Sequence, residues 1–438
     1  MKQNFRWPVA VGIATACLVA GCGQDASSPP AAGPSTDTTP PLATAPDSAR
    51  VDLEEPTFSD PTTITNPLFP INTLTQVVQI GSDADGSLRH DITLLPETKI
   101  IEWNGESIET VVSQFMAYSD GRILELATDY FAQADDGSVW YFGEDVANYV
   151  DGVLDNHDGT WLAGRDGPPG MIMPAHPQVG DVYRPENIPG IVFEEVVVKS
   201  VDERPDGPQG PIAGAVLVEE HPMDGAIEDK TFAPGYGEFF AQVVSENEVA
   251  TVSVGVPTDA LGHGIPAELA AISSVTDLIG PITDWPAAGT KVDSITTAWE
   301  SYRSDATPLT AEQVDQALAA LRTGVEAQDE SATQMAAFDL AYAATDLRLR
   351  HEGPAAADRY RMDIIARQAM LDASAEDGAF VAGDAAAMQS IWDRVRHTAA
   401  DPVAVDGALD DLRSAADAAD LAGAADAADR LRTALTQL

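Results

Sequence analysis

The sequence predicts a β domain followed by an α domain: an antiparallel β-meander, in the form of a curved sheet or open barrel, and then an antiparallel helical bundle. Two observations predict this order. Residues 51–257 contain runs of β-branched residues separated by Asp-Gly and Asn-Gly pairs, whereas residues 258–438 are rich in Ala, Leu, Asp and Arg with helical periodicity. A chain of 438 residues is long enough for two or three domains of this kind.

We expect residues 1–21 to be a secretory signal peptide. Residues 1–21 combine two basic side chains with an apolar stretch that is too short for a membrane span. The segment Leu18-Val19-Ala20-Gly21-Cys22 resembles the lipobox of bacterial lipoproteins. The resemblance implies a diacylglycerol thioether on Cys22, with a further acyl chain on its amine, and Gly23 favours the outer membrane if the host has one. The alternative is an ordinary signal peptide followed by a chance cysteine.

Residues 22–50 are expected to be a lipidated cysteine and a disordered tether. Residues 23–50 contain six prolines and eight Ser or Thr among small residues, which cannot form a hydrophobic core. A flexible segment of this length spans on the order of 30 Å, so it would separate a folded domain from the membrane surface.

Strand-like segments and tight turns alternate through residues 51–257. The segments 74–80, 108–112, 123–126 and 192–198 are rich in β-branched residues. Asp85-Gly86, Asn104-Gly105, Asp120-Gly121, Asp136-Gly137 and Asp151-Gly152 fall between such segments, and these pairs supply the positive φ angles that two-residue hairpins need. The spacing predicts a meander of antiparallel strands.

Helical periodicity begins after Pro257. Apolar residues step by three or four in Val314, Leu318, Leu321 and Val325, and the same steps recur in 388–395 and 405–412. Aspartates followed by alanines at 284, 329, 384 and 420 are interpreted as helix N-caps. We expect roughly six helices from Ala267 to Leu438.

The most distinctive motifs of the β domain lie in the segments 65–70, 129–145, 159–164, 168–177 and 179–183. Together they resemble an uncharacterised family of secreted bacterial proteins and lipoproteins. The resemblance implies a shared fold and an extracytoplasmic location, and it brings no activity and no assigned site residues.

Aromatic residues beside a Gly/Pro-rich loop suggest a small-molecule cleft lined by Trp140, Tyr141, Trp161, Met173 and His176. The competing interpretation is that the aromatic side chains fill the core of a strongly bent sheet. Both interpretations stay open at this point.

Metal binding is a second possibility. His176, Asp181, Glu219, Glu220 and His221 form a candidate metal site if the fold brings them together. Acidic turns at 83–86, 135–137 and 155–159 suggest calcium, but none has the spacing of an EF-hand loop and Asp-Gly turns explain them equally well. Haem is disfavoured because no Cys-x-x-Cys-His is present.

The charge excludes one class of function. The chain has 24 Lys and Arg against 70 Asp and Glu, a net charge of -46, which would repel nucleic acid at every approach. Residues 51–256 hold 8 basic and 37 acidic residues, so the acidity is concentrated in the β domain. No serine-nucleophile elbow, phosphate-binding loop or dinucleotide motif is present.

We therefore expect a lipid-anchored protein of the cell envelope, with no enzymatic activity, whose acidic β domain binds a cation, a small ligand or an envelope partner. The first alternative is an extracytoplasmic hydrolase that uses carboxylates and His176. The second is a purely structural or interaction lipoprotein. The catalytic residues of a hydrolase, if it is one, stay unknown.

Overall fold

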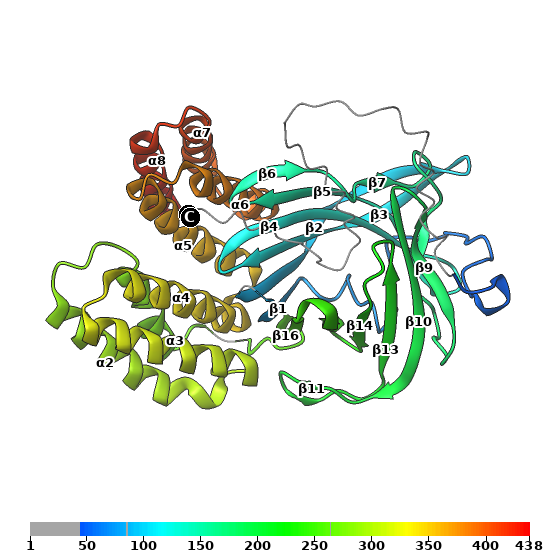
Figure 1. Ribbon diagram of the computed structural model, residues 1–438, viewed down its shortest axis with the longest axis horizontal. Helices are drawn as coiled ribbons and strands as arrows, with labels where there is room; N and C mark the ends of the chain where they lie inside the picture. The colour runs from blue at the N-terminus through cyan, green and yellow to red at the C-terminus, as the bar shows by residue number, and fades with distance from the viewer. Residues whose placement is uncertain (1–43, 85, 263) are drawn as a thin grey trace, which may run out of the picture.

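The computed structural model describes residues 44–84, 86–262 and 264–438. A large antiparallel sheet of 14 strands is followed by a helical region of eight α-helices in this described part (Figure 1). The predicted order of β structure and then helices is confirmed. The expected signal peptide and the lipid attachment at Cys22 lie outside the described residues.

The large sheet consists of two meanders joined side by side. In space the strands follow the order β6-β5-β4-β3-β2-β1-β16-β15-β14-β13-β10-β9, with β7 and β8 paired to β5, while β11 and β12 form a separate hairpin. The strands are β1 (Gln76–Ser82), β2 (Ser87–Trp103), β3 (Glu106–Ser119), β4 (Arg122–Gln133), β5 (Val139–Val150), β6 (Val153–Asn156), β7 (Trp161–Leu162), β8 (Gly170–Met173), β9 (Val182–Ile188), β10 (Val192–Glu203), β11 (Asp206–Gly207), β12 (Gly210–Pro211), β13 (Ala215–Pro222), β14 (Glu228–Ala233), β15 (Gly237–Val243) and β16 (Glu248–Val256).

Two-residue turns join β2 to β3, β3 to β4 and β5 to β6 as the sequence predicts, whereas Asp136-Gly137 lies in the longer connection 134–138 between β4 and β5. Asn104 and Gly105 between β2 and β3 have φ angles of 51° and 81°, and Asp151 and Gly152 between β5 and β6 have 49° and 78°. Positive φ at both central positions defines a type I′ turn, whose twist matches that of the flanking strands. These turns set the register of the first meander.

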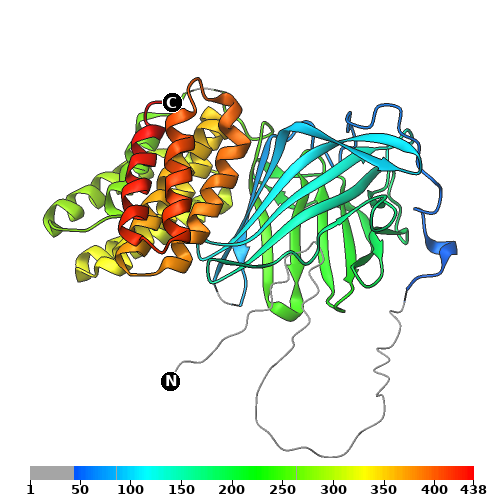
Figure 2. The ribbon, with the colours of Figure 1, turned by 90° about the horizontal axis from the view of Figure 1, so that it is seen from above.

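The sheet curls until its two ends approach each other (Figure 2). Strand β8 pairs with β5 near one end and lies against β9, the strand at the other end. The contact is tight, because a Cβ added to Gly170 would lie 1.9 Å from the carbonyl oxygen of Pro185. The curled sheet therefore has a concave interior and a convex outer face.

Side chains alternate between these two faces. On β1, Val77 and Gln79 face the interior, whereas Val78 and Ile80 pack outward in a cluster that includes Leu349 of the helical region. Where helices cover the outer face, a strand is buried on both sides, and β3 is accordingly buried at every position from Thr110 to Ser119.

The helical region contains more helices than the six expected. The helices are α1 (Ala267–Ser273), α2 (Trp285–Tyr302), α3 (Pro308–Ala327), α4 (Glu330–Glu352), α5 (Pro354–Ser374), α6 (Gly378–Val395), α7 (Val403–Asp417) and α8 (Leu421–Leu435). Asp284, Asp329 and Asp420 cap helices as predicted. Asp384 does not, because it lies buried inside α6, whose N-cap is Asp377.

The helical region lies against the outer face of the sheet (Figure 2). One hydrophobic core joins the two parts: Met116 and Tyr118 of β3 and Ile123 of β4 pack in the same cluster as the helical core. The two expected domains therefore share a buried interface. Among the described residues, no helix combines the length and the apolar character needed to cross a bilayer.

A buried cluster of charged side chains crosses this interface. Asp358 of α5 accepts hydrogen bonds from Arg361 at 2.6 Å and from Arg394 of α6 at 2.6 and 2.7 Å. Arg361 also donates to Gln76 of β1 at 2.8 Å, and Arg394 donates to Gln114 of β3 at 3.0 Å. Each arginine is satisfied partly by helices and partly by the sheet, which fixes how the two parts dock.

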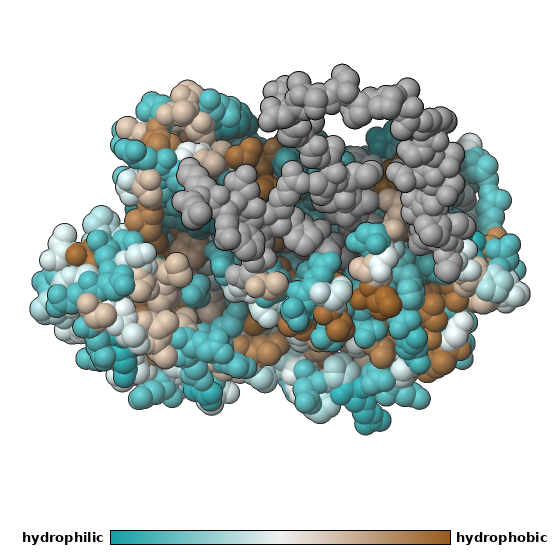
Figure 3. Space-filling view, in the orientation of Figure 1, coloured by the Kyte–Doolittle hydropathy of each residue, from teal (hydrophilic) through white to brown (hydrophobic). Residues whose placement is uncertain are grey.

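The exposed surface is mostly hydrophilic. On the face shown in Figure 3, hydrophobic residues form small patches among hydrophilic ones. Most of the large apolar side chains that are exposed, such as Val179 and Met335, are isolated from one another, whereas Val150, Val153 and Leu154 lie together on the β5–β6 hairpin. Small patches of this kind are ordinary for a folded protein.

Candidate functional site

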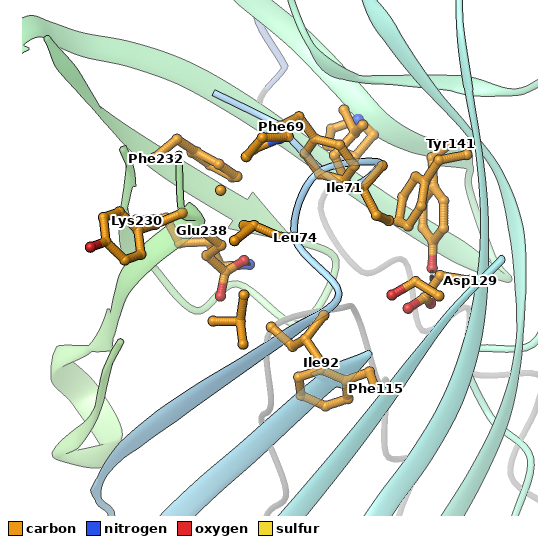
Figure 4. Close-up of a pocket in the computed structure, with 18 of the residues that line it drawn as sticks. Phe69, Ile71, Leu74, Ile92, Phe115, Asp129, Tyr141, Lys230, Phe232 and Glu238 are labelled. Carbon is orange, nitrogen blue, oxygen red and sulfur yellow. Dashed lines mark hydrogen bonds and ion pairs between the residues drawn. The ribbon is translucent and has the colours of Figure 1, made fainter. Parts of the chain in front are cut away.

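A cavity of about 120 Å³ lies in the concave interior of the curled sheet (Figure 4). Its lining comes from both meanders and from the segment that precedes β1. The lining residues are Phe69, Pro70, Ile71, Leu74, Val77, Ile92, Leu94, Ser113, Phe115, Asp129, Phe131, Tyr141, Ile172, Pro185, Glu194, Glu220, Lys230, Phe232, Tyr236, Gly237 and Glu238.

Most of this lining is apolar. Phe69, Ile71 and Leu74, from the segment before β1, lie in the middle of the cavity wall (Figure 4). Asn66 holds that segment in place by donating to the carbonyl oxygens of Gly137 and Pro174, both at 3.1 Å. The motif at 65–70 therefore folds over the interior and supplies part of the cavity wall.

Lys230 forms the polar side of the cavity with three glutamates of the lining, Glu194, Glu220 and Glu238. Lys230 Nζ lies 2.7 Å from Glu220 Oε2 and 3.6 Å from carboxylate oxygens of Glu228 and Glu238. Burial alone would lower the pKa of Lys230, but Glu220 and Glu228 outweigh it and hold that pKa well above its ordinary value. Lys230 is therefore a permanent cation and is the one basic side chain among the described residues of the lining.

Asp129 lies on the opposite side of the cavity, next to Tyr141 (Figure 4). The Tyr141 hydroxyl donates to Asp129 Oδ1 at 2.8 Å. Burial raises the pKa of Asp129 to about 7, and the hydrogen bond from Tyr141 opposes that rise. No lysine, arginine or histidine forms an ion pair with Asp129 in the described part of the chain, in contrast to Glu220.

Further buried carboxyl groups surround the cavity. Burial is the largest cause in raising the pKa of Glu125, Glu186 and Glu228 to about 8. The carboxyl of Glu144 faces that of Glu186, and burial together with this neighbour holds the pKa of Glu144 well above its ordinary value. At neutral pH these groups retain protons, which is how so many carboxyls can share one interior.

One histidine also faces the interior. His90 Nδ1 lies 2.9 Å from Gln79 Oε1, and Gln79 in turn donates to the backbone carbonyl of Glu238 at 2.9 Å. Burial lowers the pKa of His90 to about 4, so the ring is neutral at pH 7. His90 therefore adds no positive charge to offset the carboxyls.

The structure brings together four of the five residues expected to line a cleft. Trp140, Tyr141, Trp161 and Met173 are buried in one hydrophobic cluster of the sheet. Of these, Tyr141 lines the cavity, whereas Trp161 donates to Glu186 Oε1 at 3.0 Å. His176 lies in the loop after β8 and is not among the lining residues described for the cavity.

The candidate metal residues are distributed over two faces of the sheet. His221 Nε2 lies 3.1 Å from Glu219 Oε1 on the outer side of β13, whereas Glu220 points inward to Lys230. Asp181 accepts a hydrogen bond from the backbone of Gln178. Among the described residues, no group of three or more His, Cys, Asp or Glu side chains is arranged to hold a metal ion.

The acidic turns suggested for calcium use their carboxylates locally. Asp136 accepts from the backbone and hydroxyl of Ser138 at 2.9 and 2.6 Å, and Asp135 accepts from Thr57 and from the backbone of Ser59 at 2.8 Å. These bonds are typical of Asx turns and of the contact between neighbouring loops.

The acidic interior was missed at the level of sequence. Glu125, Asp129 and Phe131 alternate along β4 in the way that inward and outward residues do, but an acidic residue in a strand ordinarily marks the solvent side. The one available signal was that acidic residues lie within strands whose other residues are mostly apolar, as Glu194 does in β10 and Glu220 does in β13.

No family model, curated protein or solved structure matches the chain.

Proposed function

We propose that this protein is a lipid-anchored binding protein of the cell envelope, without enzymatic activity, and that its curled sheet binds a small organic cation with an apolar body. The observation that carries the proposal is Asp129, a buried acid without a basic partner in the described part of the chain, which lines a mostly apolar cavity. The resemblance to secreted lipoproteins and the lipobox-like segment support the location.

Electrostatics favours a cation at the Asp129 side. Lys230 already neutralises one of the carboxylates on the other side, whereas the carboxyl of Asp129 has only the Tyr141 hydroxyl as its partner. A cation near Asp129 would stabilise the ionised carboxylate in surroundings where water does not screen the interaction. An anion at the same place would instead be repelled by the ionised carboxylate of Asp129.

The size of the cavity limits the ligand. A cavity of about 150 Å³ holds benzene, so about 120 Å³ suits a molecule of similar or slightly smaller size. Phe69, Ile71 and Phe115 offer contacts to an aliphatic or aromatic body. A short alkylammonium ion has both required parts.

Thermal unfolding tests this proposal with three matched ligands. Pentylammonium, pentanol and hexanoate share a pentyl body and differ in their head groups. We expect pentylammonium to raise the unfolding temperature at pH 8, pentanol to raise it less and hexanoate to leave it unchanged. Equal shifts with all three ligands, or no shift with pentylammonium, would contradict the proposal. The hydrolase and the purely structural lipoprotein stay predictions of the sequence.

A further inference from the structure

A second hollow of about 550 Å³ lies on the helical region, where α4, α5 and α8 meet. Its lining is polar and includes four arginines, namely Arg348 of α4, Arg359 and Arg367 of α5 and Arg432 of α8. We call it the arginine groove. Residues 257–438 contain twelve arginines against 30 acidic residues, so a third of these arginines line one groove of a strongly acidic protein.

The acidic residues of the groove do not balance its arginines. Asp363 and Asp429 are the acids of the lining, and Asp363 is shared between Arg367 at 2.8 Å and Arg432 at 2.9 Å. Arg348 is paired with Glu352, one turn further along α4. The lining therefore has an excess of positive charge.

Arg359 is the clearest source of that excess. It is half-buried, and no carboxylate or other hydrogen-bond partner contacts its guanidinium in the described part of the chain. A guanidinium offers five N–H donors, and arginine suits the bidentate recognition of phosphate oxygens.

The other arginines are held in place yet keep donors in reserve. Arg367 donates from Nε to Asp363 and from Nη1 to the backbone carbonyl of Thr276, both at 2.8 Å. Arg348 uses Nε and Nη2 for Glu352, and its guanidinium stacks over the ring of Tyr360. Fixed guanidinium groups lose little side-chain entropy when an anion binds.

We propose that the arginine groove binds a phosphate-bearing anion. A phosphate carries a charge of about -1.5 to -2 near neutral pH and offers oxygen acceptors to several guanidinium groups at once. This site is separate from the cavity of the curled sheet, and it requires the opposite ligand charge. Its phosphate could belong to a soluble anion or to a phospholipid head group, and the same chemistry serves both.

Calorimetry on the full chain in neutral detergent micelles tests this proposal and separates the two sources. One titration uses inorganic phosphate, with chloride at equal ionic strength as the blank. Another uses micelles that contain phosphatidylglycerol. We expect saturable binding in at least one titration: binding of phosphate assigns a soluble anion, and binding of phosphatidylglycerol alone assigns a lipid head group. Absence of binding in both overturns the proposal.

Two arginine variants then locate the binding. Arg359→Gln removes the unpaired guanidinium, and we expect it to weaken binding at least tenfold. Arg430→Gln removes a more exposed arginine on the same helix as Arg432. Arg430 pairs with Asp411 and is not part of the groove lining. It is expected to leave binding unchanged. Equal weakening in both variants would indicate attraction to the surface charge in general and would overturn the assignment to the groove.

Discussion

Lys230 Nζ lies 2.7 Å from Glu220 Oε2, and both side chains are almost fully buried inside the curled sheet. On the outer face of neighbouring strands, Lys199 makes a similar pair with Glu219 at 3.0 Å in contact with solvent. Water therefore screens the attraction between Lys199 and Glu219 but not the attraction between Lys230 and Glu220. Removing a buried partner leaves an uncompensated charge, whereas an exposed pair contributes little.

Replacing the two lysines compares these environments directly. We expect Lys230→Met to lower the free energy of unfolding by about 3 kcal/mol or more at pH 8, and Lys199→Met to lower it by less than about 1 kcal/mol. At pH 5 the cost of Lys230→Met should be smaller, because burial raises the pKa of Glu220 and lets it take up a proton. Denaturant unfolding at both pH values measures this, and equal costs for the two lysines would contradict the interpretation.

The docking of the helical region depends on Asp358. Its carboxylate is fully buried between Arg361 and Arg394, and Asp358→Asn would remove the anion closest to both arginines, leaving Asp91 Oδ2 at 3.7 and 3.9 Å from them. We expect a loss of about 3 to 5 kcal/mol in the free energy of unfolding. Asp410→Asn, which removes an exposed pair with Arg413, should cost less than about 1 kcal/mol.

Denaturant curves of Asp358→Asn also show whether the sheet and the helices unfold in a single transition. Because the charge cluster spans the interface, the sheet and the helices should unfold together in the wild type. If the variant unfolds as readily as Asp410→Asn does, the cluster does not hold the two parts together.

The buried carboxyls make stability fall as the pH rises. Burial raises the pKa of Glu125 to about 8, so between pH 5 and 8 the folded state retains a proton that the unfolded state has released. The unfolding free energy must then decrease with pH across that range. Glu125→Gln removes one such group and should make the slope shallower by about 1 kcal/mol per pH unit. Glu106→Gln, at an exposed position of β3, serves as the control and should leave the slope unchanged.

Lipid attachment at Cys22 is a prediction of the sequence, and fatty-acid labelling tests it. In cells supplied with a labelled fatty acid, the wild-type chain should incorporate the label and sediment with membranes. Cys22→Ser should abolish the labelling, because the serine hydroxyl cannot form the thioether. Labelling that persists in the variant would show that the lipid is attached to another residue.

Much of the fold follows from local sequence. Asn104-Gly105 and Asp151-Gly152 form the turns that their residue types require, and Val314, Leu318 and Leu321 lie on the buried face of α3 as their spacing predicts. The prediction that Asp384 is an N-cap was wrong, because an aspartate followed by alanines is typical of a helix start but also occurs inside α6. Its real environment, 3.6 Å from Arg122 of β4, depends on the tertiary structure.

The candidate site was less predictable for a physical reason. Whether Asp129 or Glu220 faces water or an enclosed interior depends on the curl of the sheet and on the contact between β8 and β9, which are separated in sequence from both residues. The sequence predicts that the aromatic residues around Tyr141 lie together, because large apolar side chains are ordinarily buried. It does not predict that Asp129 and Glu220 are buried, since an acidic residue in a strand ordinarily faces solvent.

Proton release should accompany binding in the curled sheet. Burial raises the pKa of Asp129 to about 7, so a large fraction of this group is protonated in the free protein at pH 6 to 7. A bound cation favours the ionised form, and affinity should therefore increase from pH 6 to pH 8. Asp129→Asn should remove that dependence.

Calorimetric titration of pentylammonium into the full chain at pH 6 and pH 8 tests whether the interior of the curled sheet holds a cation. We expect one binding site per chain, tighter binding at pH 8, at least a tenfold loss of affinity in Asp129→Asn and no loss in Glu106→Gln. Binding that is equally tight in both variants, or the absence of binding at pH 8, would contradict the assignment of a cation site to the interior of the curled sheet.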